Sequence, residues 1–412
     1  MKDALAKLLA IGSVAGEEED IYPYGRKTGE ALDAALALCD SFGFRTHNGG
    51  YRYGYAEIGE GEEMIGILAH LDVVPAQEDW THEPFALTEE DGKLYGRGVT
   101  DDKGPAVACI YAMKDLLEQG IPNKRIRLIF GLAEEQGVFD DIKAYCENEE
   151  LPSCGFTPDG DFPAVREEKG AMLLRMRCSL QGSGFLHAEG GQAPNIVAAS
   201  AKAILATGEK VQTEGIPAHG SCPEKGRNAI TLLMEQVKDR SPFAAAYRTC
   251  IGKQTDGSGF LPEELQGKGL TINTGLLATE GDELVLWLDI RIPAALYPGQ
   301  VREALEKKLR EHLPSASFEL VFATEPFAVS ADDPSLLACL RAYREVTGDD
   351  GEALSIGGST YAKAMPGIFA FGPSVPGHPV TQHEADEYIL EEDFLALREI
   401  YRKALENLLA VE

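Results

Sequence analysis

His70 and Asp72 are the first residues of this sequence whose types and spacing could do chemistry. They follow Met64 to Ala69, an apolar run of strand length. Side chains alternate along an extended segment, so His70 and Asp72 project from the same side. A metal-binding imidazole often has its second ring nitrogen held by a carboxylate, which fixes the tautomer and the direction of the ring. Asp101 lies in a glycine-rich turn just before a helical pattern. Together, the strand end with His70 and Asp72 and the turn with Asp101 predict one metal-binding site.

Glu134 and Glu135 form a second candidate pair. They come directly after the very apolar segment RLIFGLA, at the expected end of a strand. Adjacent side chains there should diverge, so that one carboxylate ligates a cation and the other meets a bound water. Taken alone, two neighbouring glutamates are more often solvated surface residues. The end of a buried strand favours the functional interpretation, because α/β folds place their active sites there.

Asp159 and His383 are weaker candidates when each is considered alone. Asp159 follows Pro158 in the turn-like segment FTPDGDFP, and such an aspartate commonly only caps a turn. His383 precedes the last helical pattern, where an ordinary surface histidine is the simpler explanation. The GRG at 96–98 lacks the pattern of a phosphate-binding loop, so we exclude that function.

The set of candidates is more informative than its members. All are nitrogen or oxygen ligands without a thiolate, which suits zinc, with manganese or cobalt as alternatives. There are enough of them for two divalent cations that share one bridging carboxylate. The expected ligands are His70, Asp101, Glu135, Asp159 and His383.

The elements that must position these residues follow an α/β pattern. Strands are expected at 51–59, 65–69 and 125–133, with helices at 28–41, 105–119 and 139–148. A second block has expected strands at 171–178, 270–277, 283–291 and 317–323, and helices at 195–205, 228–238 and 300–312. A helix at 335–347, a strand at 367–371 and a helix at 391–409 complete the pattern.

This order predicts an α/β fold with two domains, which is the natural expectation for 412 residues. A catalytic domain with a mostly parallel sheet flanked by helices would comprise residues 1–171 and 325–412. An inserted α+β lid domain would comprise residues 172–324.

Composition narrows the possible partners and the compartment. The 67 acidic residues outnumber the 38 basic ones, and the net charge of −29 disfavours nucleic acid and anionic membranes as partners. The eight cysteines form no CxxC pair, so we expect reduced thiols and a cytoplasmic location. No apolar run approaches the length of a transmembrane helix.

Several motifs in order give the chain a resemblance to a known family. HLDVVP, YGRGVTDDKG, GLAEEQG, FTPDGDFP, GGSTYAK and TQHEADE resemble the M20 metallopeptidases, and within them the PepV/Sapep-like dipeptidase branch. The resemblance implies two metal ions held by the five ligands above, with Asp101 bridging. It also implies that Asp72 orients His70, that Glu134 is the general base, and that the Asp101–Asp102 peptide is cis.

The resemblance extends to the inserted block and to a glycine loop. His219, in GIPAHGSCPEKGRNAI, would reach the substrate carbonyl, Asn195 would hold the substrate, and Arg291 would bind its carboxylate. The loop residues Gly358, Ser359 and Thr360 would help to read that carboxylate, which restricts substrates to short peptides. Ser359 departs from the glycine often found in the family, and the lid is shorter than in well-known members. Either a monomer or a lid-mediated homodimer is compatible with the sequence.

These residues predict metal-assisted hydrolysis of dipeptides or short peptides. An N-acyl amino-acid deacylase would use the same core with a different substrate pocket. A non-catalytic metal- or peptide-binding protein would have no need of Glu134. A dipeptidase is therefore the expected function, and the other two remain as alternatives.

Overall fold

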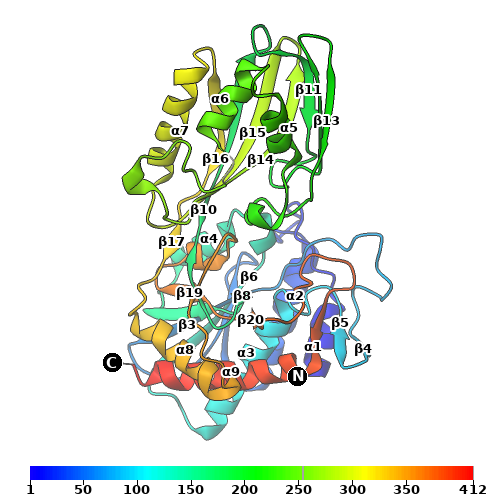
Figure 1. Ribbon diagram of the computed structural model, residues 1–412. Helices are drawn as coiled ribbons and strands as arrows, with labels where there is room; N and C mark the ends of the chain where they lie inside the picture. Colours follow the sequence, from blue (N-terminus) through cyan, green and yellow to red (C-terminus); the bar gives the residue numbers. More distant parts are fainter. Residues whose placement is uncertain (253–254, 412) are drawn as a thin grey trace. The chain divides into compact units, whose positions relative to one another are not determined.

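The computed structural model describes residues 1–252 and 255–411, which fall into two compact units. The first unit comprises Met1–Arg166, Ala328–Ser355 and Ser359–Glu412, and the second comprises Glu167–Phe327 and Ile356–Gly358. Figure 1 shows the course of the chain through both. The domain boundary predicted between residues 171 and 172 falls inside a strand that begins at residue 170.

The first unit contains a large mixed sheet with helices against it. Its helices are α1 (Lys2–Leu9), α2 (Arg26–Ser41), α3 (Lys103–Gln119), α4 (Asp140–Asn148), α8 (Pro334–Thr347) and α9 (Glu391–Leu409), with short 3-10 turns η1 (Glu134–Gln136) and η4 (Tyr361–Lys363). The strands of the large sheet are β1 (Arg45–Asn48), β2 (Gly54–Ile58), β3 (Met64–His70), β6 (Arg125–Gly131), β7 (Cys154–Thr157), β9 (Val165–Glu168), β17 (Phe327–Ala328), β18 (Leu354–Ile356) and β19 (Ile368–Ala370). Smaller sheets contain β4 (Thr88–Glu90), β5 (Lys93–Tyr95), β8 (Gly160–Asp161), β20 (Pro373–Ser374) and β21 (Tyr388–Leu390).

The strand order of the large sheet explains how distant segments meet. It is β1-β2-β6-β3-β7-β19-β9-β17, with β18 beside β9. The four central strands β6, β3, β7 and β19 are parallel, whereas β2 and β9 pair antiparallel at either side. The carboxyl ends of β3, β6 and β7 therefore lie at one edge of the sheet. The predicted α/β fold is confirmed, with a parallel centre and antiparallel margins.

Both faces of this sheet are covered, as a parallel sheet requires. On one face Leu68 and Ile129 pack with Ile142 and Tyr145 of α4 in a shared buried cluster. On the other face Phe156 of β7 stacks on Tyr401 of α9, and α9 packs along α3. All seven residues of β3 are buried, which accounts for its nearly continuous apolar sequence.

The second unit is an antiparallel sheet with helices on one face, as seen in Figure 1. Its strand order is β13-β12-β11-β14-β15-β10-β16. These strands are β10 (Gly170–Ser179), β11 (Phe185–Gly190), β12 (Ser200–Leu205), β13 (Lys210–Glu214), β14 (Thr271–Glu280), β15 (Glu283–Ile292) and β16 (Ser317–Ala323), and the helices are α5 (Ala229–Val237), α6 (Pro242–Cys250) and α7 (Pro298–His312), with turns η2 (Pro223–Lys225) and η3 (Glu263–Leu265).

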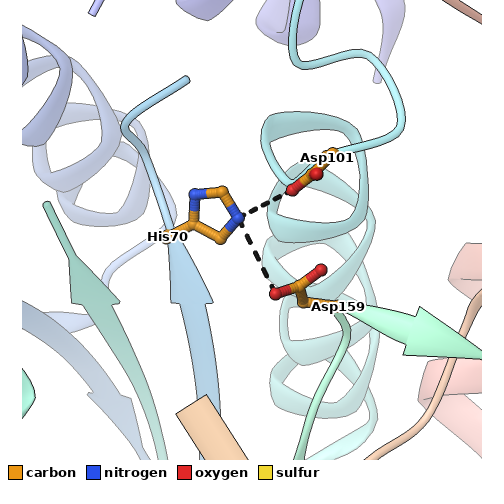
Figure 2. Close-up of side chains that lie close together, drawn as sticks. All are labelled: His70, Asp101 and Asp159. Atoms are coloured by element: carbon orange, nitrogen blue, oxygen red, sulfur yellow. Dashed lines mark hydrogen bonds and ion pairs between the residues drawn. The ribbon is translucent and has the colours of Figure 1, made fainter. Parts of the chain in front are cut away.

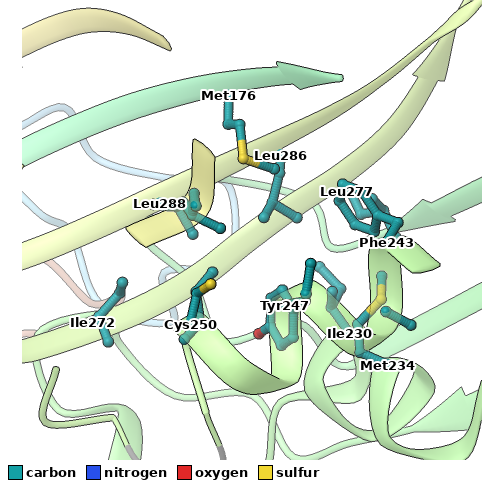
Figure 3. Packing of buried hydrophobic residues seen from close by; sticks show 14 of the residues in the cluster. Met176, Ile230, Met234, Phe243, Tyr247, Cys250, Ile272, Leu277, Leu286 and Leu288 are labelled. Atoms are coloured by element: carbon teal, nitrogen blue, oxygen red, sulfur yellow. The ribbon is translucent and has the colours of Figure 1, made fainter. Parts of the chain in front are cut away.

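The core of the second unit lies between its sheet and its helices. Figure 3 shows Leu286 and Leu288 of β15 directed toward Tyr247 and Cys250 of α6, all of them buried. This core is separate from that of the first unit, so the second unit has its own apolar interior.

The helix predicted at 195–205 is wrong. Residues 200–205 form β12, which pairs with β11 on one side and β13 on the other. Ala201, Ala203 and Leu205 are buried, and Lys202 between them is exposed, so the segment alternates with the period of a strand. Alanine-rich composition favoured a helix, and pairing with two neighbouring strands overrides that preference.

No helix within residues 1–252 and 255–411 is long and apolar enough to cross a membrane. The eight cysteines, all of which the structure describes, are unpaired thiols, as predicted.

Candidate metal centre

The predicted ligands lie at the carboxyl ends of the central parallel strands. His70 is the last residue of β3, and Asp159 lies two residues beyond β7. Glu135 lies in η1, just after β6, and Asp101 lies two residues before α3. His383 comes from the loop before β21, with a φ of 64°. The sheet order thus brings together residues that are far apart in the sequence.

Three of these side chains form a first group around His70 (Figure 2). The Nε2 atom of His70 lies 2.8 Å from Oδ1 of Asp101 and 3.8 Å from Oδ2 of Asp159. His70 is fully buried, and the two carboxylates are mostly buried. Their ligand atoms lie within 4.8 Å of one another, which is the spacing of a metal site.

Asp101 belongs to a second group as well. Its other oxygen, Oδ2, lies 3.1 Å from Nε2 of His383, and that nitrogen lies 3.0 Å from Oε2 of Glu135. The ligand atoms of these three side chains also lie within 4.8 Å of one another. Asp101 therefore directs one oxygen to each group, which is the geometry of a carboxylate shared by two cations.

The ring of His70 is fixed by Asp72, although not as the sequence suggested. Nδ1 of His70 lies 3.0 Å from the backbone oxygen of Asp72 and 3.4 Å from its carboxylate. The carboxylate instead accepts hydrogen bonds from the backbone N–H groups of Glu134 and Glu135, each at 3.1 Å. Asp72 thus orients the imidazole mainly through its backbone, and its side chain holds the turn that carries the two glutamates.

The close approach of these groups shifts their pKa values. Hydrogen bonds to Asp101 and Glu135 raise the pKa of His383 to about 10. Burial opposes protonation of His70, but Asp101 and Asp72 outweigh it and hold the pKa of His70 well above its usual value. Burial likewise opposes ionisation of Asp101, yet His383 and His70 keep its pKa well below the usual range. Without a cation, the imidazole of His383 is therefore in its charged, protonated form at neutral pH.

Glu134 lies beside these groups but belongs to neither. Only 9% of its surface is exposed. Burial first, and then the negative charge of Asp159, raise the pKa of Glu134 well above its usual value. A buried carboxyl with a raised pKa next to a cluster of metal-type ligands suits a group that accepts and returns a proton.

The loop that carries Asp101 is tied to the loop that carries His383. The buried carboxylate of Glu387 accepts hydrogen bonds from the backbone of Gly98 at 2.9 Å, Thr100 at 2.9 Å and Asp101 at 3.3 Å, and from Arg97 at 2.8 Å. Sequence reasoning missed Glu387, which is the last acidic residue of the motif that contains His383. The peptide between Asp101 and Asp102 is cis, as the resemblance implied.

Replacing Glu387 with alanine should lower the free energy of unfolding by about 3–5 kcal/mol, the cost of removing one partner of a buried ion pair. The change leaves Arg97, which is 1% exposed, without its carboxylate. Chemical denaturation of the metal-free protein measures the effect. Glu384→Ala, at an exposed neighbouring position, is the matched control and should change the unfolding free energy by less than about 0.5 kcal/mol. Equal effects in both variants would contradict this role of Glu387.

The candidates of the inserted block lie in the second unit. An isolated bridge pairs His219 with Ile196, and the backbone oxygen of Asn195 accepts a hydrogen bond from Gly220 at 2.7 Å, so Asn195 and His219 lie on neighbouring segments. Partial burial and the charge of Arg291 lower the pKa of His219. The neutral imidazole accepts a hydrogen bond at Nδ1 from the backbone of Ser221 at 3.2 Å, which leaves Nε2 as a donor.

Arg291 already has partners in this structure. Its Nε and Nη2 atoms donate to the two carboxylate oxygens of Asp289 at 3.0 and 3.1 Å, and Nη1 donates to the backbone oxygen of Gly357 at 3.1 Å. Gly358 and Ser359 follow directly, and the hydroxyl of Thr360 caps η4 by accepting from Ala362 at 3.1 Å. The predicted carboxylate-reading arginine and glycine loop are thus joined through Gly357.

An α/β sheet that gathers two groups of nitrogen and oxygen ligands at its carboxyl edge has the arrangement expected of a site for two divalent cations. The family model "Peptidase family M20/M25/M40" matches residues 66–407 of this chain. The chain belongs to this family, and the predicted M20 metallopeptidase is confirmed.

Individual relatives agree with this assignment over nearly their full length. The chain is 32% identical to "Putative dipeptidase YtjP" of Bacillus subtilis, with 94% of this chain and 92% of that protein covered. It is 29% identical to a Beta-Ala-Xaa dipeptidase of Lactobacillus delbrueckii, with 99% and 96% covered. The fold matches that of an M20 family metallo-carboxypeptidase from Sulfolobus solfataricus with a TM-score of 0.62 at 17% identity, covering 100% of this chain and 99% of that one.

Proposed function

We propose that this chain is a metal-dependent dipeptidase in which Glu134 is the general base. The proposal rests on one observation: two groups of metal-type ligands share Asp101, and a buried glutamate beside them takes part in neither. The names of two relatives matched over nearly their full length, "Putative dipeptidase YtjP" and "Beta-Ala-Xaa dipeptidase", support the substrate class. The substrates would be dipeptides or other short peptides.

The residues fit a pair of divalent cations. Nδ1 of His70 faces a backbone oxygen at 3.0 Å and donates its proton there, so the lone pair of Nε2 faces an oxygen of Asp101 at 2.8 Å. Nε2 of His70 and this oxygen of Asp101 would both act as acceptors, and two acceptors 2.8 Å apart require a proton or a cation between them. His70, Asp101 and Asp159 would hold one cation, and Asp101, Glu135 and His383 the other. The donor set of nitrogen and oxygen atoms suits zinc, with manganese or cobalt as alternatives.

The bound cations would polarise the amide carbonyl and lower the pKa of the attacking water. Glu134 would take the proton of that water and pass it to the leaving amine. His219 would donate its Nε2–H to the carbonyl oxygen as negative charge develops there. Its lowered pKa favours the neutral imidazole, and the hydrogen bond from the backbone of Ser221 to Nδ1 places the proton on Nε2.

Other residues of the chain would hold the substrate. Arg291 would bind the terminal carboxylate through the remaining N–H groups of Nη1 and Nη2, because Asp289 occupies Nε and one N–H of Nη2 and Gly357 occupies one N–H of Nη1. Asn195 and the loop of Gly358, Ser359 and Thr360 would contribute polar contacts. Recognition of a free carboxylate would confine the enzyme to short peptides.

A panel of substrates tests the proposal against its alternatives. Metal-free protein would be supplied with Zn²⁺, Mn²⁺ or Co²⁺ and assayed on dipeptides, N-acetyl amino acids and N-succinyl amino acids. Hydrolysis of dipeptides with the highest kcat/KM supports the dipeptidase, and a preference for N-acyl amino acids would establish a deacylase instead. Metal binding without turnover of any of them would indicate a binding protein.

Metal binding to the metal-free chain should release protons, about one or more per chain at pH 7, because the ligands must lose them. His383, with a pKa of about 10, is protonated before binding, and the raised pKa of His70 acts in the same direction. Apparent affinity should therefore rise as the pH increases toward 10 and fall as the pH decreases. Calorimetry in buffers of different ionisation enthalpy counts the protons.

His383→Ala should reduce the number of released protons by about one. His312→Ala, at an exposed histidine on α7, is the control and should leave the count unchanged. Binding without proton release at pH 7 would show that the imidazoles are not ligands.

A further inference from the structure

The short turn between β6 and α4 is held by two buried carboxylates. The backbone N–H groups of residues 132 and 133 donate to Oδ2 of Asp141 at 2.7 and 2.9 Å. Those of residues 134 and 135 donate to the two oxygens of Asp72, each at 3.1 Å. Both aspartates are fully buried. Four consecutive backbone N–H groups thus donate hydrogen bonds to two buried carboxylates. The turn that they fix carries Glu134 and Glu135.

Asp141 is itself held by the hydroxyl of Tyr361. Tyr361 donates to Oδ2 of Asp141, the oxygen that the turn also uses, and Oδ1 accepts from Ile142 at 2.8 Å. Tyr361 is fully buried. A β-carbon on Gly131 would lie 2.0 Å from the hydroxyl oxygen of Tyr361, so only glycine fits at position 131 beside this hydroxyl. The ring of Tyr361 also meets the ring of His70 edge-on, at 6.3 Å between centroids.

The hydrogen bond from Tyr361 to Asp141 has a definite direction. Burial and the charge of Asp141 hold the pKa of Tyr361 well above its usual value, so the hydroxyl keeps its proton and donates it. Burial raises the pKa of Asp141, whereas the bonds from Tyr361 and from the backbone lower it. A buried carboxylate that lost one of these donors would hold the turn less firmly.

We propose that Tyr361 is a positioning residue: through Asp141 it fixes the backbone turn that aims Glu134 at the ligand groups. Tyr361 follows the loop residues expected to read the substrate, but its complete burial precludes contact with a substrate. This inference rests on the function proposed for Glu134. The segment GGSTYAK would then influence the orientation of Glu134 through Tyr361, in addition to any role of its other residues in binding the substrate.

Tyr361→Phe removes only the donor and keeps the ring. In this variant the carboxylate of Glu134 would be oriented less precisely, so kcat should fall by about 10–100-fold, the usual effect of losing a residue that orients a functional side chain. Contacts with the substrate would be unchanged, so KM should change by less than about threefold. Tyr401→Phe is the matched control, since Tyr401 is equally buried and its hydroxyl has no hydrogen-bond partner among the described residues. This control should keep the kcat of the natural chain.

A second measurement needs neither metal nor turnover. In the metal-free protein, amide hydrogen exchange across residues 132–135 should become about tenfold faster or more in Tyr361→Phe and remain unchanged in Tyr401→Phe. Asp141→Asn should reproduce both the exchange and the kcat effect. The double variant should show little further loss, because the two residues act through one contact.

The outcomes separate this inference from the proposed function. Unchanged kcat and unchanged exchange in Tyr361→Phe overturn the positioning role, even where Glu134→Gln is inactive and the dipeptidase stands. A fall in kcat that Tyr401→Phe matches, or a rise in KM alone, overturns it as well. Faster exchange together with a Glu134→Gln variant that remains active shows that the turn is held as described and that the proposed function is wrong.

Discussion

Replacing Glu134 with glutamine should lower kcat for dipeptide hydrolysis by about 10²–10⁴-fold, the range of a general acid–base group. Glutamine has nearly the same shape and keeps the backbone N–H that Asp72 accepts at 3.1 Å. It cannot take a proton from water, however. The five ligand-type side chains are unchanged, so metal content and unfolding free energy should remain close to those of the natural chain. Steady-state kinetics with metal analysis of the same sample measures both.

Glu78→Gln makes the same chemical change at an exposed position of the first unit and should leave kcat unaltered. Dipeptide turnover at the normal rate by Glu134→Gln, with both cations bound, would exclude Glu134 as the base. Loss of the cations in this variant would instead assign Glu134 to the metal groups, which the distances do not support.

The central part of the fold and the ligand candidates were predictable because their signals are local. An apolar strand such as 65–69 is recognised from its composition, and His70 and Glu135 each follow such a strand, while Asp101 lies in a glycine-rich turn. That β3 and β6 are parallel follows from the alternation of strands and helices, whereas β7, which precedes Asp159, was not predicted from the sequence. The meeting of His70, Asp101 and Asp159 is then a consequence of topology.

The supporting contacts were not predictable from local sequence. Tyr361 and Asp141 are 220 positions apart, and Arg97 and Glu387 are 290 apart, so no window of sequence contains either pair. The strand at 200–205 was missed for a related reason. Its alternation becomes informative only once its two partner strands are known, because single-segment preference favours a helix.

Asp101→Ala should weaken metal binding more than about 100-fold, beyond the 10–100-fold that the loss of an orienting partner usually costs. Asp101 directs Oδ1 to His70 at 2.8 Å and Oδ2 to His383 at 3.1 Å, so its removal takes a ligand from both groups. Asp72 is not a proposed ligand of either cation, so Asp72→Asn should weaken metal binding only by about 10–100-fold. Competition with a chromogenic chelator would rank the two variants against the natural chain.

The number of cations distinguishes a shared ligand from a private one. Loss of a ligand private to one group would leave one tightly held cation, as expected for Asp159→Ala or Glu135→Ala. Loss of Asp101 should leave none held tightly, since both groups fall to two side chains. Asp79→Ala, at an exposed position, controls for the removal of one negative charge from this strongly acidic protein. If Asp101→Ala retained one cation at natural affinity, Asp101 would be a ligand in only one of the two groups. A different residue would then have to be the ligand that the two cations share.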